Sequence, residues 1–200
     1  MSGWIEVVVG SMYSGKTEEL IRRVRRAQYA KLKVQVFKPI IDQRYHQTNV
    51  TSHNKNQVEA TPLQNINDVW DYVEDDTKVV GFDEGQFFTM DLVQVCRDLA
   101  ARGLRVIVSG LDMDWKGLPF EPIPTLMAIA EDVTKHRAIC TKCGELATYT
   151  QKIGGSESQI EVGSQDFYEA RCRIHFKPKV ESVAAITMTA QVQTADQSPI

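Results

Sequence analysis

Short apolar runs recur along the first 110 residues of the chain, at intervals typical of buried strands. Ile5 to Val9 is mostly β-branched, and Lys33 to Lys38 alternates between apolar and polar positions until Pro39 stops it. Lys78 to Phe82 and Leu104 to Ser109 are two further runs of this kind. Runs of this length, bounded by turn residues, favour β-strands in a buried sheet.

The segments between these runs carry helical patterns. Thr17 to Lys31 repeats apolar residues along one face, Ile66 to Val73 is a shorter amphipathic segment, and Met90 to Arg102 is closed by Gly103. Thr125 to Ala130 is a short helical stretch. Strands that alternate with helices predict an α/β fold, with a mostly parallel sheet and helices on both of its faces.

The remaining segments are less regular and suggest how the chain is divided. Residues 40–64 are polar and rich in turn residues, so we expect a long loop of functional importance. Asp132 to Ile139 predicts one strand, after which glycines, serines and cysteines become frequent. We therefore expect a main domain over residues 1–135, a small second domain over 136–177 and a largely disordered tail over 178–200.

A phosphate-binding motif follows the first predicted strand directly. Gly10-Ser-Met-Tyr-Ser-Gly-Lys-Thr17 fits the pattern GxxxxGK[ST], between a strand and a helix as the mechanics of such a loop require. Its backbone N–H groups surround phosphate oxygens, Lys16 reaches the terminal phosphates and the Thr17 hydroxyl binds Mg²⁺. The predicted phosphate-binding residues are Gly10, Ser11, Met12, Tyr13, Ser14, Gly15, Lys16 and Thr17.

Two carboxylates follow the third predicted strand. Asp83 is at the position of a second Mg²⁺-side acid, acting directly or through water. Glu84 comes next and is a candidate general base. In a motor ATPase this base would activate water, and in a small-molecule kinase it would accept a proton from a substrate hydroxyl. Glu84 alone does not choose between these two classes.

Three of the four cysteines predict a metal site late in the chain. Cys140 and Cys143 form one CxxC pair, and Cys172 and His175 form a CxxH pair after residues 144–171. Three thiolates and one imidazole make a closed tetrahedral set for a structural Zn²⁺. We hypothesise that zinc fixes the ends of the glycine-bearing segment 151–168, which would act as a lid. Cys96 stands apart in an apolar helix and is predicted to be a core residue.

Composition narrows the classes of partner. The 200 residues are 42% hydrophobic and 24% charged, with a net charge of −3, which argues against a duplex nucleic-acid binder. An arginine cluster between residues 22 and 26 could contact nucleic acid, but a solvated helix face is the favoured interpretation. No segment is apolar for the length of a membrane span, and no signal peptide is recognised, so we expect a cytoplasmic protein without membrane or nucleic-acid partners.

These motifs together resemble the thymidine kinases that carry a RecA-like P-loop domain and a zinc-binding lid. The resemblance extends from about Trp4 to His175. It rests on Gly10–Thr17 with its Met12, on Lys38-Pro39-x-x-Asp42-x-Arg44-Tyr45, on Ser52-His53, on Phe82–Phe88, on Gly110-Leu111-Asp112 through Pro119-Phe120, and on Val162-Gly163 to Tyr168 with Cys172-Arg173.

The resemblance implies a role for each matched residue. Glu84 would deprotonate the 5′-hydroxyl of thymidine, while Lys16, Thr17 and Asp83 would hold the phosphates of ATP and Mg²⁺. Arg44, with Asp42 nearby, would stabilise charge on the transferring phosphoryl group. The thymine ring would be enclosed by Met12, Leu111, Trp115, Phe120 and Tyr168, and its edge would be bound by the main chain of Val162, Gly163 and Ser164. The family also implies a homotetramer inhibited by the end product dTTP, and activity on deoxyuridine is expected as well.

Several positions depart from the family pattern or have another explanation. Trp115 stands where the family commonly has Phe, Lys55 where Gly is usual, and Ser164 where Gly or Ala is common. Taken alone, Trp115 and Phe120 are better explained as core residues, so their place in the pocket rests on the resemblance. A RecA-like motor ATPase and a non-enzymatic zinc module are the alternatives, and the acidic charge and the intact phosphate loop, respectively, count against them.

Overall fold

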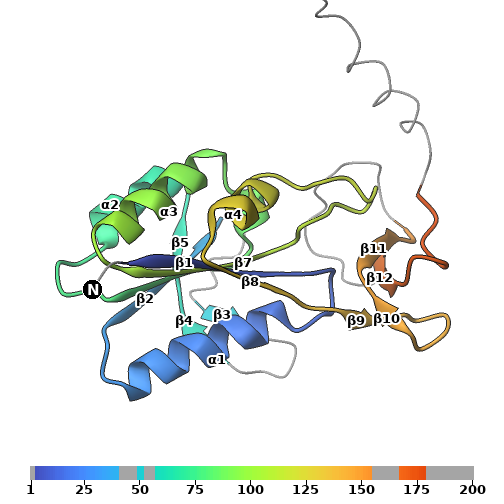
Figure 1. The fold of residues 1–200 in the computed structure, drawn as a ribbon, viewed down its shortest axis with the longest axis horizontal. Coiled ribbons are helices and arrows are strands. Elements are labelled where there is room, and N and C mark those ends of the chain that lie inside the picture. Colours follow the sequence, from blue (N-terminus) through green and yellow to red (C-terminus); the bar gives the residue numbers. More distant parts are fainter. Residues whose placement is uncertain (1–2, 41–48, 52–56, 155–166, 179–200) are drawn as a thin grey trace, which may run out of the picture.

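The centre of the molecule is a six-stranded parallel sheet (Figure 1). The computed structural model describes residues 3–40, 49–51, 57–154 and 167–178. In spatial order the strands are β5 (Thr61–Leu63), β2 (Val34–Pro39), β6 (Val79–Phe82), β7 (Arg105–Gly110), β1 (Trp4–Val9) and β8 (Asp132–Lys135). Each neighbouring pair is parallel. The predicted mostly parallel sheet is confirmed.

Helices cover both faces of this sheet, as predicted (Figure 1). One face carries α1 (Lys16–Tyr29), with the small hairpin of β3 (Asn49–Thr51) and β4 (Gln57–Glu59) beside it. The other face carries α2, α3 and α4. The bounds of the remaining helical elements are η1 Ile66–Asp68, α2 Val69–Tyr72, η2 Gly85–Phe87, α3 Asp91–Ala101 and α4 Ile123–Ile129.

Alternation along β1 explains the two separate cores. Ile5, Val7 and Val9 are buried in the cluster that includes residues of α3 and α4, whereas Val8 is buried in the cluster that includes Leu20 of α1. Successive side chains of a strand point to opposite faces, so one apolar strand supplies both layers. The strand that precedes the phosphate loop is therefore held from both sides.

Glu6 interrupts this apolar strand and organises a buried ionic network beneath α1. Arg23 Nη1 lies 2.6 Å from Glu6 Oε2, and Arg105 Nε lies 2.7 Å from Glu6 Oε1. Burial acts to raise the pKa of Glu6, but hydrogen bonds from Arg105 and Trp4 outweigh it and lower the pKa. The expectation of a solvated arginine face is wrong for Arg23, which is 8% exposed, because the charge of Glu6 draws it toward the sheet. Arg22, Arg25 and Arg26 are exposed.

Three local predictions differ from the structure. Residues 40–64 are not one irregular loop, since β5 forms an edge of the main sheet, where Pro62 is tolerated because an edge strand can lack one donor. The expected helix Ile66–Val73 is a 3-10 turn followed by one α-helical turn. The expected strand Asp132–Ile139 breaks after Lys135, where the His136 N–H donates to Val9 O and the chain leaves the sheet.

A second, smaller group of strands lies beyond one end of the main sheet (Figure 1). β9 (Ala138–Ile139) pairs with β10 (Leu146–Ala147), and β11 (Tyr149–Lys152) pairs with β12 (Tyr168–Arg171). These strands share their own small core, made of Ala138, Cys140, Ala147, Ala170 and Cys172. Most of the predicted lid, 155–166, and the tail from 179 lie outside the described residues. Among the helices that the structure does describe, none has the length and apolar character needed to cross a bilayer.

Candidate active site and metal centre

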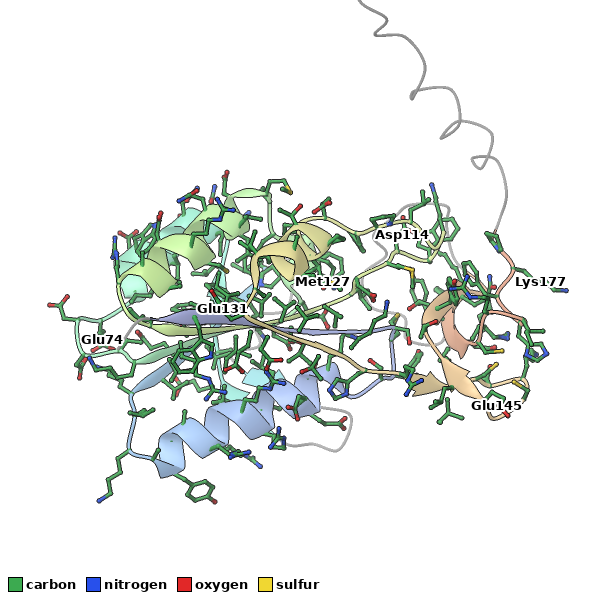
Figure 2. The ribbon with its side chains drawn as sticks, in the orientation of Figure 1. Glu74, Asp114, Met127, Glu131, Glu145 and Lys177 are labelled. Atoms are coloured by element: carbon green, nitrogen blue, oxygen red, sulfur yellow. The ribbon has the colours of Figure 1, made fainter. Side chains whose placement is uncertain are left out.

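Three adjacent strands bring the predicted site residues to one edge of the sheet. β6, β7 and β1 are neighbours, and all three are parallel, so their carboxyl ends meet. The phosphate loop follows β1, Asp83 and Glu84 follow β6, and the loop that begins at Leu111 follows β7. In open α/β sheets, ligands bind outside the carboxyl ends of the strands. Asp114 and Glu145 lie toward this end, and Glu74 lies at the opposite end (Figure 2).

The phosphate loop uses glycines where its backbone requires them. Gly15 caps α1 with φ 82°, in the left-handed region that disfavours side chains. A Cβ atom on Gly10 would lie 2.4 Å from His136 O and 2.8 Å from Ser14 Oγ. The loop therefore packs directly against the chain that leaves β8, and any side chain at Gly10 would force the two apart.

Several polar groups of the loop are buried without a structural partner. Lys16 Nζ donates to Ser11 O at 2.9 Å, and burial lowers the pKa of Lys16, partly offset by the charges of Glu84 and Asp83. Ser11 Oγ and Ser14 Oγ are buried with no hydrogen-bond partner among the described residues. Buried polar atoms are normally paired, so a loop with such orphaned atoms fits a phosphate group well.

Asp83 lies beside Thr17 in an arrangement suited to a shared cation. The Thr17 hydroxyl lies 3.4 Å from Asp83 Oδ2, and Ser109 Oγ donates to Asp83 Oδ1 at 2.9 Å. Burial, followed by repulsion from Glu84, raises the pKa of Asp83 to about 7. A hydroxyl and a buried carboxylate are hard oxygen ligands, which fit Mg²⁺, and a cation would offset the charge that burial disfavours.

Glu84 adopts a left-handed backbone conformation, with φ 52° and ψ 40°. This conformation costs a non-glycine residue roughly 1–2 kcal/mol, and such strain tends to cluster at functional sites. Phe87 N–H donates to Glu84 O at 3.0 Å, which closes the turn. The Glu84 carboxylate is half-buried and accepts a hydrogen bond of 2.5 Å from Gln86 Nε2. The carboxylate is therefore oriented by Gln86 and still accessible to a substrate, as a general base must be.

The loop after β7 is held in a fixed shape by Asp114. Its carboxylate accepts hydrogen bonds from Lys116 N at 2.8 Å and from Leu118 N at 3.0 Å. Trp115 and Phe120 are 6% and 9% exposed, respectively. Their burial fits the expectation that each of them, taken alone, packs as a core residue.

Aromatic residues predicted for the pocket gather around one buried cation. Lys152 Nζ lies 5.1 Å from the centroid of the Trp115 ring and 5.6 Å from that of the Tyr168 ring. Phe120 packs edge-on against Phe87, with 6.1 Å between ring centroids. The loop after β7 and the strand β12 therefore meet through Lys152, although they are far apart in the sequence.

The phosphate loop is also tied directly to the second group of strands. Met12 N–H donates to Thr150 Oγ1 at 3.0 Å, and the Tyr13 hydroxyl donates to Tyr168 O at 3.1 Å. Thr150 is buried. Thr150, Lys152 and Gln86 were not among the predicted site residues. Gln86 falls inside a recognised motif, but no local signal marks Thr150 or Lys152, because only tertiary packing brings them to the loop.

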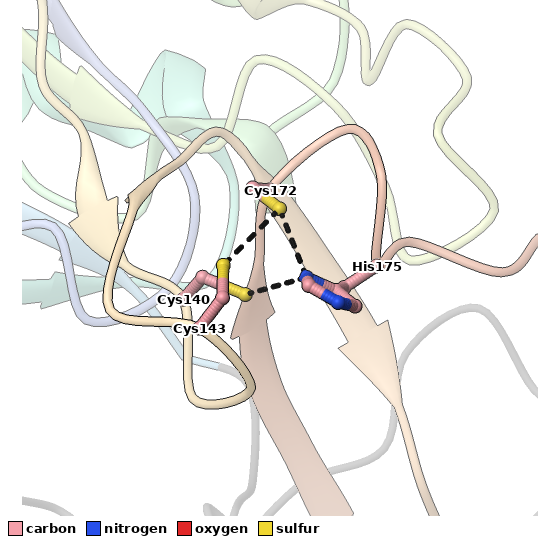
Figure 3. Close-up of side chains that lie close together, drawn as sticks. All are labelled: Cys140, Cys143, Cys172 and His175. Atoms are coloured by element: carbon pink, nitrogen blue, oxygen red, sulfur yellow. Dashed lines mark hydrogen bonds between the residues drawn. The ribbon is translucent and has the colours of Figure 1, made fainter.

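The predicted Cys/His cluster assembles in the second group of strands (Figure 3). Cys143 Sγ lies 3.7 Å from Cys172 Sγ, while His175 Nδ1 lies 3.8 Å from Cys140 Sγ and 3.3 Å from Cys172 Sγ. Zn–S bonds of about 2.3 Å at a tetrahedral angle place two sulfurs about 3.8 Å apart. All four ligand atoms lie within 4.8 Å of one another, so the geometry fits a closed zinc site with Nδ1 as the imidazole ligand.

Cys96 lies apart from the metal cluster, and part of the predicted site falls outside the described residues. Cys96 is buried within α3, as predicted, and burial raises the pKa of its thiol. Five predicted site residues lie outside the described residues: Asp42 and Arg44 of the Lys38–Tyr45 motif, and Val162, Gly163 and Ser164 of the lid. Lys55, one of the departures from the family pattern, lies outside them as well.

Comparisons with known proteins agree on one family. The family model described as "Thymidine kinase" matches residues 3–176. A thymidine kinase from Bdellovibrio bacteriovorus is 59% identical over 180 residues, covering 90% of this chain and 88% of the relative. A thymidine kinase from a Rhodothermus species is 49% identical over 194 residues, covering 96% of this chain and 91% of the relative.

Proposed function

The chain belongs to the thymidine kinase family, and we propose that it transfers the γ-phosphate of ATP to the 5′-hydroxyl of thymidine to give dTMP. The observation that carries the proposal is the position of Glu84. Glu84 follows directly on Asp83, whose carboxylate lies beside the hydroxyl of Thr17 in the phosphate loop. The side chain of Gln86 is hydrogen-bonded both to Glu84 and to Leu111 N–H, and so links Glu84 to the loop after β7. One carboxylate thus lies between the donor side and the acceptor side.

On the donor side, the phosphate loop binds and orients ATP. The backbone N–H groups and Lys16 hold the β- and γ-phosphates, and the orphaned Ser11 and Ser14 hydroxyls are available to the same oxygens. Thr17 and Asp83 would hold Mg²⁺, which supplies charge neutralisation on the phosphates when bound. Arg44, near Asp42, is proposed to stabilise charge on the transferring group.

On the acceptor side, Glu84 accepts the proton of the 5′-hydroxyl. The oxygen of that hydroxyl then forms a bond to the γ-phosphorus, the bond to the bridging oxygen of ADP breaks, and ADP leaves with that electron pair. The kinase is favoured over a motor ATPase by the family of the chain and by Trp115 and Phe120, whose rings in the loop after β7 are of the kind that stacks on a planar base.

The thymine ring is proposed to lie between Met12, Leu111, Trp115, Phe120 and Tyr168. The cation of Lys152, shared by Trp115 and Tyr168, supports placing these two rings in one wall. The main chain of Val162, Gly163 and Ser164 would bind the edge of the base. Closure of this lid would exclude water, which otherwise competes with the hydroxyl as acceptor.

Zinc is proposed as a structural ion of the second domain, over residues 136–177, with the main domain over 1–135. The Cys140, Cys143, Cys172 and His175 cluster leaves no open ligand position, so it supplies stability and no chemistry. Cys172 follows β12 directly, and β12 pairs with β11, so zinc would fix both strands from which the lid extends.

Finer properties are proposed on the family resemblance alone. They are activity on deoxyuridine, inhibition by dTTP at the acceptor site, a homotetrameric assembly and a cytoplasmic location, with no nucleic-acid or membrane partner. Trp115, which replaces the usual Phe, is the position most suited to alter the shape of the base pocket.

The proposal is tested by measuring phosphate transfer from ATP to thymidine by the wild-type protein and by Glu84→Gln. We expect Mg²⁺-dependent dTMP formation by the wild-type protein, and a loss of at least about 100-fold in the variant. The variant should still bind ATP, because the phosphate loop is unchanged. Near-normal turnover by Glu84→Gln would rule out the carboxylate as the base.

A further inference from the structure

We propose that Gln86 is a positioning residue that holds the catalytic carboxylate of Glu84 and links it to the loop that receives the acceptor. The inference rests on the proposed function, since it assigns Glu84 as the base. Gln86 lies in η2 and is 3% exposed. Its Nε2 donates to Glu84 Oε2 at 2.5 Å, and its Oε1 accepts from Leu111 N–H at 2.9 Å. One side-chain amide therefore bridges two parts of the site.

The chemistry of the partners fixes which way the amide points. A backbone N–H can only donate, so the atom that faces Leu111 must be the amide oxygen. The opposite end of the amide is then the NH₂ group, and it faces Glu84. An ionised carboxylate can only accept, which agrees with this orientation. The two partners together allow a single orientation of the amide.

Close packing leaves the amide little room to turn away. A Cβ atom on Gly110 would lie 2.9 Å from Gln86 Oε1, and one on Gly85 would lie 2.9 Å from Val108 Cγ1. Gly110 therefore sits where a side chain would displace the bridging amide, whereas a side chain on Gly85 would meet the apolar side chains of Val108 and Ile123.

The bridge has two consequences for the reaction. It occupies one oxygen of the Glu84 carboxylate, and no described residue donates a hydrogen bond to the other oxygen, which is left to accept the proton of the substrate hydroxyl. It also ties the position of the base to Leu111, the first residue of the acceptor loop. A shift of the loop would therefore shift the base with it. Gln86 acts through Glu84 and does not itself touch the reacting atoms.

The test compares kcat and KM in variants of Gln86. Gln86→Met removes both hydrogen bonds at similar volume and should lower kcat for thymidine about 10- to 100-fold, since small misplacements of a reactive group cost this much. The KM for ATP should change by less than about twofold, because the phosphate loop is not touched. Gln94→Met, the same change on the exposed face of α3, is the matched control and should leave kcat unchanged.

Two further variants separate positioning from packing. Gln86→Glu keeps the size of the side chain and an acceptor for Leu111 N–H, but it lacks the amide donor to Glu84, so a kcat loss at least as large is expected. If Gln86 acts through Glu84, adding Gln86→Met to Glu84→Gln should lower the residual rate no further.

The possible outcomes distinguish this inference from the proposed function. A wild-type protein that transfers no phosphate to thymidine overturns the proposed function, and the inference with it. An active wild-type protein with a kcat reduced less than twofold in folded Gln86→Met or Gln86→Glu overturns only the role of Gln86. Additive losses in the double variant would likewise show that Gln86 does not act through Glu84.

Discussion

The buried carboxylate of Asp83 should make the ligand-free protein less stable as the pH rises. Its pKa is raised from 3.8 to about 7 by burial and by the charge of Glu84. Because the folded-state pKa lies above the unfolded one, the penalty is absent below about pH 4 and is complete above about pH 7. At 1.36 kcal/mol per unit, the shift sets a ceiling of about 4 kcal/mol.

Asp83→Asn removes this penalty and should therefore stabilise the ligand-free protein while impairing Mg²⁺-dependent transfer. The amide keeps an acceptor for Ser109, but Lys16 loses a nearby negative charge. We therefore expect a net gain of about 2 kcal/mol near pH 8, well below the ceiling set by the pKa shift. The gain should shrink toward about pH 5, where the wild-type carboxyl is largely protonated.

Urea unfolding at about pH 5 and about pH 8, with a chelator present, measures both effects. Asp71→Asn, an exposed change on α2, is the matched control and should stay within about 0.5 kcal/mol of the wild type at either pH. A gain for Asp83→Asn that is equal at both pH values, or a loss of stability near pH 8, would refute the reasoning.

Two further predictions concern the zinc site and the buried ionic network. Elemental analysis should find stoichiometric zinc in the wild-type protein and in Cys96→Ala, but a strong loss in Cys143→Ser, because Cys143 belongs to the Cys/His cluster and Cys96 does not. Undetectable zinc in the wild type would rule out the site. Arg23→Met should lower the free energy of unfolding by about 3 kcal/mol, because it leaves the buried Glu6 with one guanidinium partner fewer. A loss below about 1 kcal/mol in urea unfolding would show that Arg105 and Trp4 suffice to hold that charge.

The sequence predicts the parts of the site whose chemistry is local. The phosphate loop needs glycines, a lysine and a threonine at fixed spacing, and the metal cluster needs paired ligands at close spacing. Both patterns therefore identified residues that the structure brings together. The parallel arrangement of the sheet was also predictable, because alternation of strands and helices permits few arrangements other than a parallel sheet.

The parts that the sequence did not reveal depend on contacts between distant segments. Arg23 carries the charge of a surface residue, and only the position of Glu6 on the adjacent strand explains its burial. Thr150 contacts Met12 across most of the chain. The role of Gln86 required the position of the Leu111 N–H group, which follows a different strand. No periodicity or spacing encodes such pairs.

The most direct test of the central claim is phosphate transfer from ATP to matched nucleosides with the product identified. We predict transfer to thymidine and to 3′-deoxythymidine, which keeps the 5′-hydroxyl, and none to 5′-deoxythymidine, which lacks it. A parallel reaction with dTTP tests the proposed inhibition. The account would be contradicted if the protein hydrolysed ATP without a nucleoside, hydrolysed it faster with added DNA, and formed no dTMP. That result would favour a motor ATPase.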